Sequence, residues 1–228
     1  NHDQPRMVSK FGNDTPKFRA ISSKMLSTFV FTMRGTPFYF QGDELGMTNI
    51  RFNSIEDYND VEARNQYAKL IEIGGDTKAF IEDKKQTSRE NSRTPFQWNN
   101  AINAGFSEGK PWLKVHPNYT EINAEAQEKD KNSILTYFKK LVQLRKKEPV
   151  LTYGTFELVD KSNPTVFAYT RTLNAKKWLV VLNFSEQESK ITISLPVANA
   201  KVILSNYNSV HFNTTLQPFE AIILELNK

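Results

Sequence analysis

The chain has 228 residues, 39% of them hydrophobic and 12% aromatic, which is enough for one large domain or two smaller ones with a buried core. Its 30 Lys and Arg residues against 25 Asp and Glu leave a net charge of only +5, and the two signs are interleaved, so nucleic-acid binding is not predicted. Cysteine is absent, which excludes disulfides, cysteine-ligated zinc and a cysteine nucleophile and favours a cytoplasmic protein. No run of about 18 apolar residues occurs, so no membrane span is expected.

The first pattern along the chain is an amphipathic helix followed by a short aromatic segment. Thr15 and Pro16 are typical of a helix start, and apolar residues then recur every three or four positions until about Gly35. The run TPFYFQG at 36–42 predicts a short strand buried on both faces. A helix, a short loop and a buried strand in succession indicate an α/β fold.

Residues 42–132 interrupt this rhythm as a long and largely irregular excursion. A short helix is expected to begin at 54–57 and another to cover 76–85, and the second half is rich in Asn, Gly, Pro and aromatic residues. Excursions of this length in compact domains are usually functional or disordered. Trp98 and Trp112 lie in this excursion, which argues against disorder.

The last part of the chain changes from a helical period to a strand period. Residues 133–147 carry one apolar stripe, and Pro149 ends the predicted helix. Short β-branched and aromatic runs spaced by about ten residues then predict an antiparallel sandwich. We therefore expect two domains, 1–150 and 151–228. The expected strands are 155–159, 165–171, 177–184, 190–195, 200–205 and 219–226.

The stretch with the most functional groups is NHDQPR at residues 1–6. His2 and Asp3 have two interpretations: a hydrogen-bonded structural pair, or a pair that binds a polyhydroxyl ligand, because a carboxylate accepts and an imidazole donates hydrogen bonds. Arg6 is suited to orient a carboxylate through a charge-assisted pair. No two of the three histidines lie within four residues of each other, so no metal site is predicted.

Four motifs together resemble glycoside hydrolase family 13, the α-amylase superfamily. They are NHDQPRMVSKFGND, GTPFYFQGDELGMTN, NSRTPFQWNN and GKPWLKVHPNYTEINAEAQ. The last motif narrows the resemblance to the subfamily of oligo-1,6-glucosidases and α-glucosidases, which also holds trehalose-6-phosphate hydrolases, dextran glucosidases and sucrose isomerases. The resemblance is dense from residue 1 to about Gly154 and looser through the β-rich end.

This resemblance implies the C-terminal part of a (β/α)8 barrel, from the end of strand seven through helix eight, followed by an all-β antiparallel sandwich. Residues 16–34 then match barrel helix seven, "PFYFQ" matches strand eight, and 133–147 match the closing helix. Active sites of such barrels lie at the C-terminal ends of the strands, which places NHDQPR and the excursion on the reactive face. The other strands are expected in the upstream part of the same barrel or in another copy of the chain.

The chemistry implied by the family is retaining glycoside hydrolysis with no organic cofactor and no metal, carried out by an Asp nucleophile and a Glu acid/base. Both belong to segments upstream of NHDQPR, so residues 1–228 alone are expected to be inactive. Asp3 matches the remaining essential acid, which stabilises the transition state. His2 matches the neighbouring histidine, which binds the same sugar.

The resemblance also assigns the remaining site residues. Arg93 matches an arginine that, in exo-acting relatives, pairs with an upstream Asp and closes the pocket beyond the non-reducing end of the substrate. Gln4 resembles oligo-1,6-glucosidases at its position, Arg6 supports the site, and Arg89 is assigned to the surface or to a structural role.

The leading expectation is an exo-acting α-glucosidase that cleaves α-1,6 bonds in short oligosaccharides. Alternatives within the subfamily are a trehalose-6-phosphate hydrolase and a sucrose isomerase. An alternative of another class is a non-catalytic carbohydrate-binding or scaffold module.

Overall fold

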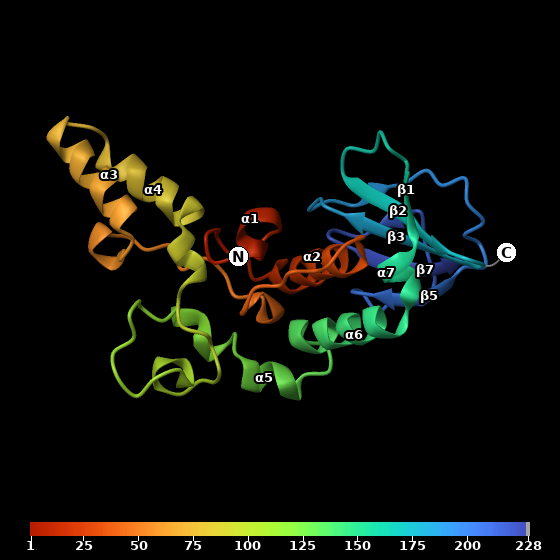
Figure 1. Cartoon of the computed structure of the whole chain (residues 1–228), viewed down its shortest axis with the longest axis horizontal. Helices are drawn as coiled ribbons and strands as arrows, with labels where there is room; N and C mark the ends of the chain where they lie inside the picture. The colour runs from red at the N-terminus through yellow and green to blue at the C-terminus, as the bar shows by residue number, and fades with distance from the viewer. Residues whose placement is uncertain (227–228) are drawn as a thin grey trace. The chain divides into compact units, whose positions relative to one another are not determined.

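The computed structural model describes residues 1–226, and its internal contacts divide the chain into two units that alternate along the sequence (Figure 1). The first unit contains residues 1–13 and 39–135, and the second contains residues 14–38 and the chain from 136 onward. The domain division that the sequence predicts at residue 150 stays a prediction. In the part that the structure describes, no helix has both the length and the apolar character needed to cross a bilayer.

The first unit consists of short helices joined by long loops (Figure 1). The helix expected at 76–85 is confirmed, whereas 54–57 forms only a 3-10 turn. A further helix, α3, was not predicted, although Ala63, Tyr67 and Leu70 recur along it at helical spacing. The α-helices are α1 (Met7–Phe11), α3 (Val61–Glu72), α4 (Thr77–Thr87) and α5 (Ala124–Lys129). The 3-10 helices are η1 (Asp43–Leu45), η2 (Ile55–Asp57), η3 (Arg89–Ser92), η4 (Ile102–Gly105) and η5 (Pro117–Thr120).

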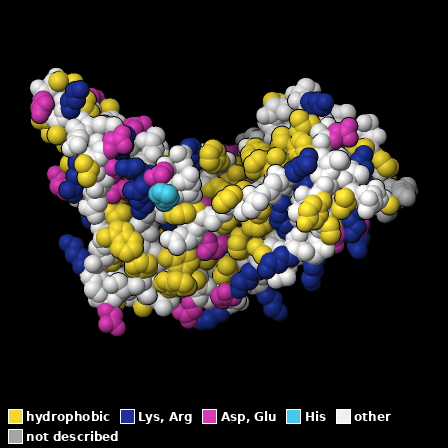
Figure 2. Space-filling model, viewed as in Figure 1, with side chains coloured by type: hydrophobic (Ala, Val, Ile, Leu, Met, Phe, Trp, Pro, Cys, Tyr) yellow, Lys and Arg dark blue, Asp and Glu magenta, His cyan; other side chains and the backbone are white. Residues whose placement is uncertain are grey.

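Helices α3 and α4 form a pair that begins at two aspartate caps. The side chain of Asp60 accepts a hydrogen bond from the backbone of Glu62 at 3.0 Å, and Asp76 caps α4 in the same way. The two helices contact each other through Tyr67 and Phe80, whose ring centroids lie 5.9 Å apart. On the face shown in Figure 2, acidic and basic side chains lie side by side over the α3–α4 region.

The aromatic segment predicted as a buried strand is not a strand, so this prediction is wrong. Residues 36–40 pair with no strand in the described chain, and the side chain of Phe38 is 90% exposed. A strand needs a neighbouring backbone with which to exchange hydrogen bonds. An aromatic run indicates an extended backbone, but it carries no information about the partner strand.

The second unit begins with α2 (Arg19–Thr32), which starts later than the sequence predicted. The backbone carbonyl of Thr15 accepts hydrogen bonds from Phe18 and Arg19, so Thr15 opens a turn that precedes the helix. The helix buries several hydroxyl groups along with its apolar residues. Those of Thr28 and Thr32 donate to the carbonyls four residues earlier, at 2.8 and 2.6 Å, which satisfies them inside the protein.

Helix α6 (Ile134–Lys147) confirms the helix predicted at 133–147, and α7 (Pro149–Tyr153) follows it directly. Arg145 of α6 donates hydrogen bonds to the carbonyls of Phe31 and Met33, at 2.7 and 3.1 Å. These carbonyls end α2 and have no partner within their own helix. Arg145 therefore joins α6 to the end of α2.

The β-rich end forms antiparallel sheets, as the sequence predicts. One sheet has the strand order β1-β2-β3-β7-β5, and β4 pairs with β6 in a second. The 190–195 prediction is too long, because β4 ends at Lys190, and β6 was not predicted. The strands are β1 (Thr155–Val159), β2 (Val166–Leu173), β3 (Lys176–Asn183), β4 (Ser189–Lys190), β5 (Lys201–Ser205), β6 (Thr215–Leu216) and β7 (Ala221–Leu226).

Apolar residues cover both faces of the larger sheet. On one face, Leu179 of β3 packs in a buried cluster with Ile191 and Leu216 from the region of the small sheet, which confirms the sandwich. On the other face, the hydroxyl of Tyr169 lies 2.5 Å from the Thr32 hydroxyl of α2. The alternation of side chains along each strand produces these two faces.

Candidate active site

The carboxylate of Asp3 is the centre of the candidate site. A turn at the start of the chain presents it, in which the backbone of Asp3 donates to the Asn1 side chain at 2.9 Å. Arg93 donates from Nη2 to Oδ1 of Asp3 at 2.7 Å, and Nε2 of His2 lies 3.1 Å from Oδ2. The Asp3 side chain remains 50% exposed, so one face of the carboxylate is open to a ligand. The structure thus brings His2, Asp3 and Arg93 together. The resemblance pairs Arg93 with an upstream Asp, whereas among the described residues its carboxylate partner is Asp3.

Arg93 is held rigidly enough to define the position of Asp3. It follows the 3-10 helix η3, and its Nε donates to the backbone carbonyl of His2 at 2.9 Å. The carbonyl of Arg93 in turn accepts from the indole nitrogen of Trp112 at 2.9 Å. One guanidinium therefore fixes both the backbone of His2 and the carboxylate of Asp3. Charge-assisted bonds of this kind are shorter and stronger than neutral ones.

Gln4 and Arg6, the other two predicted residues, differ in their exposure. The side-chain oxygen of Gln4 accepts a hydrogen bond from Lys10, and both side chains are exposed. The predicted contact between Gln4 and substrate stays a prediction. Arg6, by contrast, is fully buried, with its backbone N–H bonded to Asn49 at 2.9 Å and its Nη1 donating to the Gln41 carbonyl at 2.6 Å.

Arg6 is part of a buried charged cluster beneath the site. Nη1 of Arg6 lies 3.8 Å from a carboxylate oxygen of Asp43, and the guanidinium stands over the ring of Phe40 at 5.5 Å. Burial raises the pKa of Asp43 to about 6, although the nearby positive charge of Arg6 opposes this shift. Burial also raises the pKa of Glu44, whose carboxylate accepts from the backbone of Gly42 at 2.7 Å. The buried position of Arg6 suits the structural role proposed for it.

A polar cleft that the sequence did not indicate opens beside Asp3. It has a volume of about 220 Å³ and is lined by Asp3, Asp60, Glu62, Ala63, Gln66, Lys84, Thr87, Ser88 and Arg89. Arg89 donates two hydrogen bonds to the Asp60 carboxylate, at 2.7 and 2.8 Å, and its Nη1 lies 3.7 Å from Asp3. Arg89 thus has a structural role, and it also lies next to the site. Asp60 could have been found only as a helix cap, since its pairing with Arg89 spans 29 residues.

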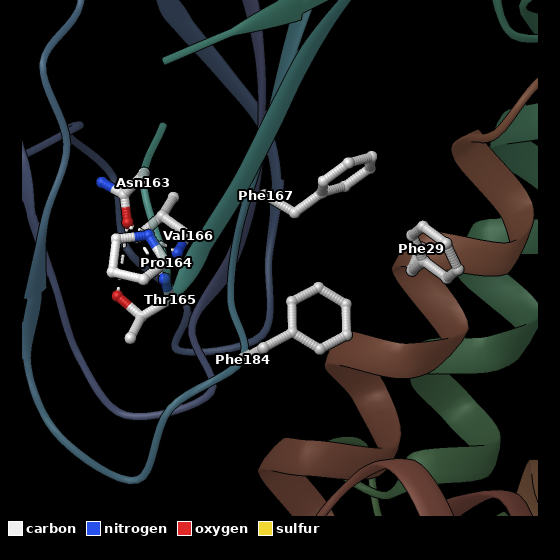
Figure 3. Close-up of a pocket in the computed structure, with 7 residues that line it drawn as sticks. All are labelled: Phe29, Asn163, Pro164, Thr165, Val166, Phe167 and Phe184. Carbon is white, nitrogen blue, oxygen red and sulfur yellow. Dashed lines mark hydrogen bonds between the residues drawn. The ribbon is translucent and has the colours of Figure 1, made fainter. Parts of the chain in front are cut away.

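A second hollow lies in the other unit and is shown in Figure 3. Three phenylalanines, Phe29, Phe167 and Phe184, line it together with 163–166. The side-chain oxygen of Asn163 already accepts from the backbone of Val166 at 2.9 Å, and its nitrogen donates elsewhere. The hollow has no ionisable side chain among its lining residues, so it offers no group for acid–base chemistry.

Among residues 1–226, no group of three or more His, Cys, Asp or Glu side chains has an arrangement that could hold a metal ion. His116, for example, is occupied by Thr48, whose hydroxyl lies 3.0 Å from its Nε2. The groups gathered at the candidate site are a carboxylate, an imidazole and guanidinium groups.

Comparison with known proteins defines the class. Residues 1–154 match the alpha amylase catalytic domain, and residues 156–223 match the maltogenic amylase C-terminal domain. These are a portion of a glycoside hydrolase barrel and the antiparallel β domain that follows it. The chain belongs to the alpha-amylase family, glycoside hydrolase family 13.

Individual relatives agree with this assignment. The chain is 42% identical to an oligo-1,6-glucosidase of Bacillus cereus, over 99% of the chain and 41% of the relative. It is 44% identical to a trehalose-6-phosphate hydrolase of Bacillus subtilis strain 168, over 100% of the chain and 42% of the relative. The structure of an isomaltulose synthase from Erwinia rhapontici NX5, solved with its natural substrate sucrose, superimposes with a TM-score of 0.92 at 45% identity, covering 100% of this chain and 42% of that one. The chain thus spans about two fifths of the length of the relatives it matches.

Proposed function

We propose that this chain supplies part of the active site of a retaining, exo-acting α-glucosidase that hydrolyses α-1,6 bonds in short oligosaccharides. The observation that carries the proposal is the half-open Asp3 carboxylate, clamped by Arg93 at 2.7 Å and flanked by His2 at 3.1 Å. Such a group can accept hydrogen bonds from two sugar hydroxyls while its charge stabilises an oxocarbenium-like transition state.

In the proposed mechanism, Asp3 is neither the nucleophile nor the proton donor. A retaining glycosidase needs one carboxylate that attacks the anomeric carbon and a second that protonates the leaving oxygen and then activates water. We assign both to barrel segments outside these 228 residues, and therefore propose that the 228-residue chain alone is inactive. Its partner in catalysis is the remainder of the barrel, in the same polypeptide or in another copy.

The surroundings of Asp3 suit a small sugar substrate. Besides its bond to Asp3, Arg93 is proposed to pair with an upstream Asp and to close the pocket beyond the non-reducing end of the substrate. On the other side, Glu62 and Gln66 in the 220 Å³ cleft offer acceptors and a donor for further hydroxyl groups. Gln4, exposed at the edge, is proposed to contact the sugar as well. The absence of cysteine supports a cytoplasmic location, and the two family matches support the proposed domains 1–150 and 151–228.

The test uses a chimera in which this chain replaces the matching segment of the Bacillus cereus oligo-1,6-glucosidase. We expect the chimera to hydrolyse isomaltose, and Asp3→Asn to lower its kcat by at least about 10²-fold, because a preorganised transition-state interaction is lost. Asp76→Asn is the matched control, because Asp76 is a helix cap and asparagine caps equally well. It should leave kcat unchanged.

The alternatives are distinguished by substrate in the same assay. Trehalose 6-phosphate and sucrose are offered alongside isomaltose, since relatives of comparable identity include a trehalose-6-phosphate hydrolase and an isomaltulose synthase. Near wild-type kcat in the Asp3→Asn chimera would remove Asp3 from the mechanism. An inactive chimera that still binds isomaltose would favour the non-catalytic module instead.

A further inference from the structure

Glu90 is a buried carboxylate placed between the two arginines that face Asp3. It lies in the 3-10 helix η3, one residue after Arg89 and three before Arg93, and is only 3% exposed. Both of its side-chain oxygens accept from the backbone N–H of Asn59, at 2.9 and 3.0 Å. Burial raises the pKa of Glu90, while the backbone N–H groups of Asn59 and Asp60 lower it to a smaller extent. A buried carboxylate is costly, and these backbone bonds offset part of its cost.

The first connection to the active site runs through Asp60. Asp60 is the neighbour of Asn59, so the bonds of Glu90 set the backbone that carries the Asp60 side chain. The Asp60 carboxylate then holds Arg89 by two hydrogen bonds at 2.7 and 2.8 Å. Nη1 of Arg89 in turn lies 3.7 Å from Asp3. Each step is a hydrogen bond, an ion pair or a neighbouring residue.

The second connection runs through Trp112. The side-chain nitrogen of Asn59 donates to the carbonyl of Trp112, and the Trp112 indole donates to the carbonyl of Arg93 at 2.9 Å. Arg93 then donates to Asp3 at 2.7 Å. Both routes therefore begin at Asn59, the residue that Glu90 fixes, and both end on the same carboxylate.

We infer that Glu90 is a positioning residue for the active site, because its carboxylate fixes the Asn59–Asp60 backbone from which both arginines facing Asp3 are held. This inference rests on the proposed function for its catalytic consequence, although its geometric part does not depend on activity. Glu90 touches no substrate in this scheme. It acts on Asp3 only through Asp60, Trp112 and the two arginines.

The geometric part is tested on the 228-residue chain by nuclear magnetic resonance. The indole resonance of Trp112 is assigned by its loss in Trp112→Phe, and its chemical shift and hydrogen exchange report the bond to Arg93. In Glu90→Gln, one oxygen of the carboxylate becomes an amide nitrogen that cannot accept from the backbone. We expect the Trp112 indole signal to shift and its exchange to accelerate by about tenfold, the change that the loss of a bond worth about 1.4 kcal/mol gives.

Glu220→Gln is the matched control. Glu220 is also a buried carboxylate that accepts from a backbone N–H, that of Gln217 at 2.8 Å, but it belongs to the other unit. We expect both variants to lose stability and only Glu90→Gln to move the Trp112 signal. Equal loss of stability with an unchanged Trp112 signal would reduce Glu90 to a structural residue and overturn the inference.

The catalytic part is tested in the chimera with the Bacillus cereus enzyme. Glu90→Gln is expected to lower kcat/KM on isomaltose by roughly 10- to 100-fold, and Glu90→Asp, which keeps the charge, to recover part of that loss. In the Trp112→Phe background, where one route is already broken, the effect of Glu90→Gln should shrink. Full additivity of the two variants would contradict the Trp112 route.

These measurements separate the inference from the proposed function. If the unmodified chimera is inactive, the proposed function fails while the Trp112 resonance still decides the role of Glu90. If the chimera is active and Glu90→Gln changes neither kcat/KM nor the Trp112 signal, the inference fails alone. Should Glu90→Gln prevent folding, Glu90→Asp is measured in the same two assays. A wild-type Trp112 signal and a wild-type kcat/KM in Glu90→Asp, together with a wild-type kcat/KM in Trp112→Phe, would reject the inference.

Discussion

Arg93 donates a 2.7 Å hydrogen bond to Asp3 across 90 residues of sequence. The bond joins the segment NHDQPR, at residues 1–6, to the loop that follows η3. Because Asp3 is half exposed, burial contributes little to the strength of this pair. Its strength comes from its geometry and from the other hydrogen bond of Arg93, which goes to the His2 backbone. The pair therefore orients Asp3 more than it stabilises the fold.

Replacing Arg93 should affect activity more than stability. In the chimera, Arg93→Lys keeps the charge but loses the two-point contact, so we expect kcat/KM on isomaltose to fall by about 10-fold or more, and by a larger factor in Arg93→Ala. The free energy of unfolding of the 228-residue chain should change by less than about 1 kcal/mol. Arg34→Lys, at an exposed position of the second unit, serves as the control. A wild-type kcat/KM in Arg93→Lys would show that the two-point contact is not needed.

Asp43 should make stability depend on pH in a specific window. Its pKa is raised from 3.8 to about 6, so between these values the folded chain holds a proton that the unfolded chain has released. Stability from this group is therefore highest at low pH and falls by up to ~3 kcal/mol as the pH rises from about 4 to about 6. The measurement is urea unfolding of wild type and Asp43→Asn at several pH values. The difference between the two should follow this fall, and a difference that is constant with pH would contradict the shifted pKa.

Gly42 should not tolerate a side chain. Its φ is +95°, and an added Cβ would lie 2.7 Å from the Met47 sulfur and 2.8 Å from Nη1 of Arg6. Gly42→Ala is expected to cost roughly 1–3 kcal/mol in the free energy of unfolding, because strain and overpacking act together. Gly109→Ala is the control, since its Cβ would come no nearer than 3.8 Å to the Ser107 hydroxyl. Equal unfolding midpoints for the two variants would show that Arg6 is less tightly packed than described.

Leu179 should be a major contributor to the stability of the β domain. It is fully buried in β3 and packs between the two sheets. Leu179→Ala is expected to lower the free energy of unfolding by about 2–5 kcal/mol, because it leaves a cavity. Leu158→Ala removes the same atoms from a residue of β1 that is 37% exposed, and should cost less than about 1 kcal/mol. Similar losses from both, measured by circular dichroism during urea unfolding, would argue against a tightly packed core.

Local periodicity was sufficient for much of the secondary structure. The apolar stripe of 134–147 and the alternating strands of the β domain are patterns within one element, and a pattern of this kind can be read without knowing what lies next to it. α3 shows where this fails. It is held by the Asp60 cap and by its contact with α4 through Tyr67, and its short apolar stripe stands among many charged and polar residues.

The candidate site likewise has residues that the sequence indicates and residues that it does not. The motifs identified the family, and they singled out His2, Asp3 and Arg93 as residues of one site. They did not indicate Asp60, Glu90 or the bond from Trp112 to Arg93. These residues form hydrogen bonds with partners 19 to 31 positions away in the chain. A local period in the sequence does not indicate such contacts.

By itself, the sequence determined the family, the antiparallel β domain, the closing helix and the chemical types of the residues at the site. Only the tertiary structure decided that Arg93 clamps Asp3, that Arg89 belongs beside it, that Arg6 and Asp43 share a buried cluster, and that residues 36–40 stay unpaired. The physical reason is the range of the interactions. Helix and strand periods follow from the backbone geometry of neighbouring residues, whereas a salt bridge, a buried carboxylate or a strand pairing exists only when distant segments have been brought together.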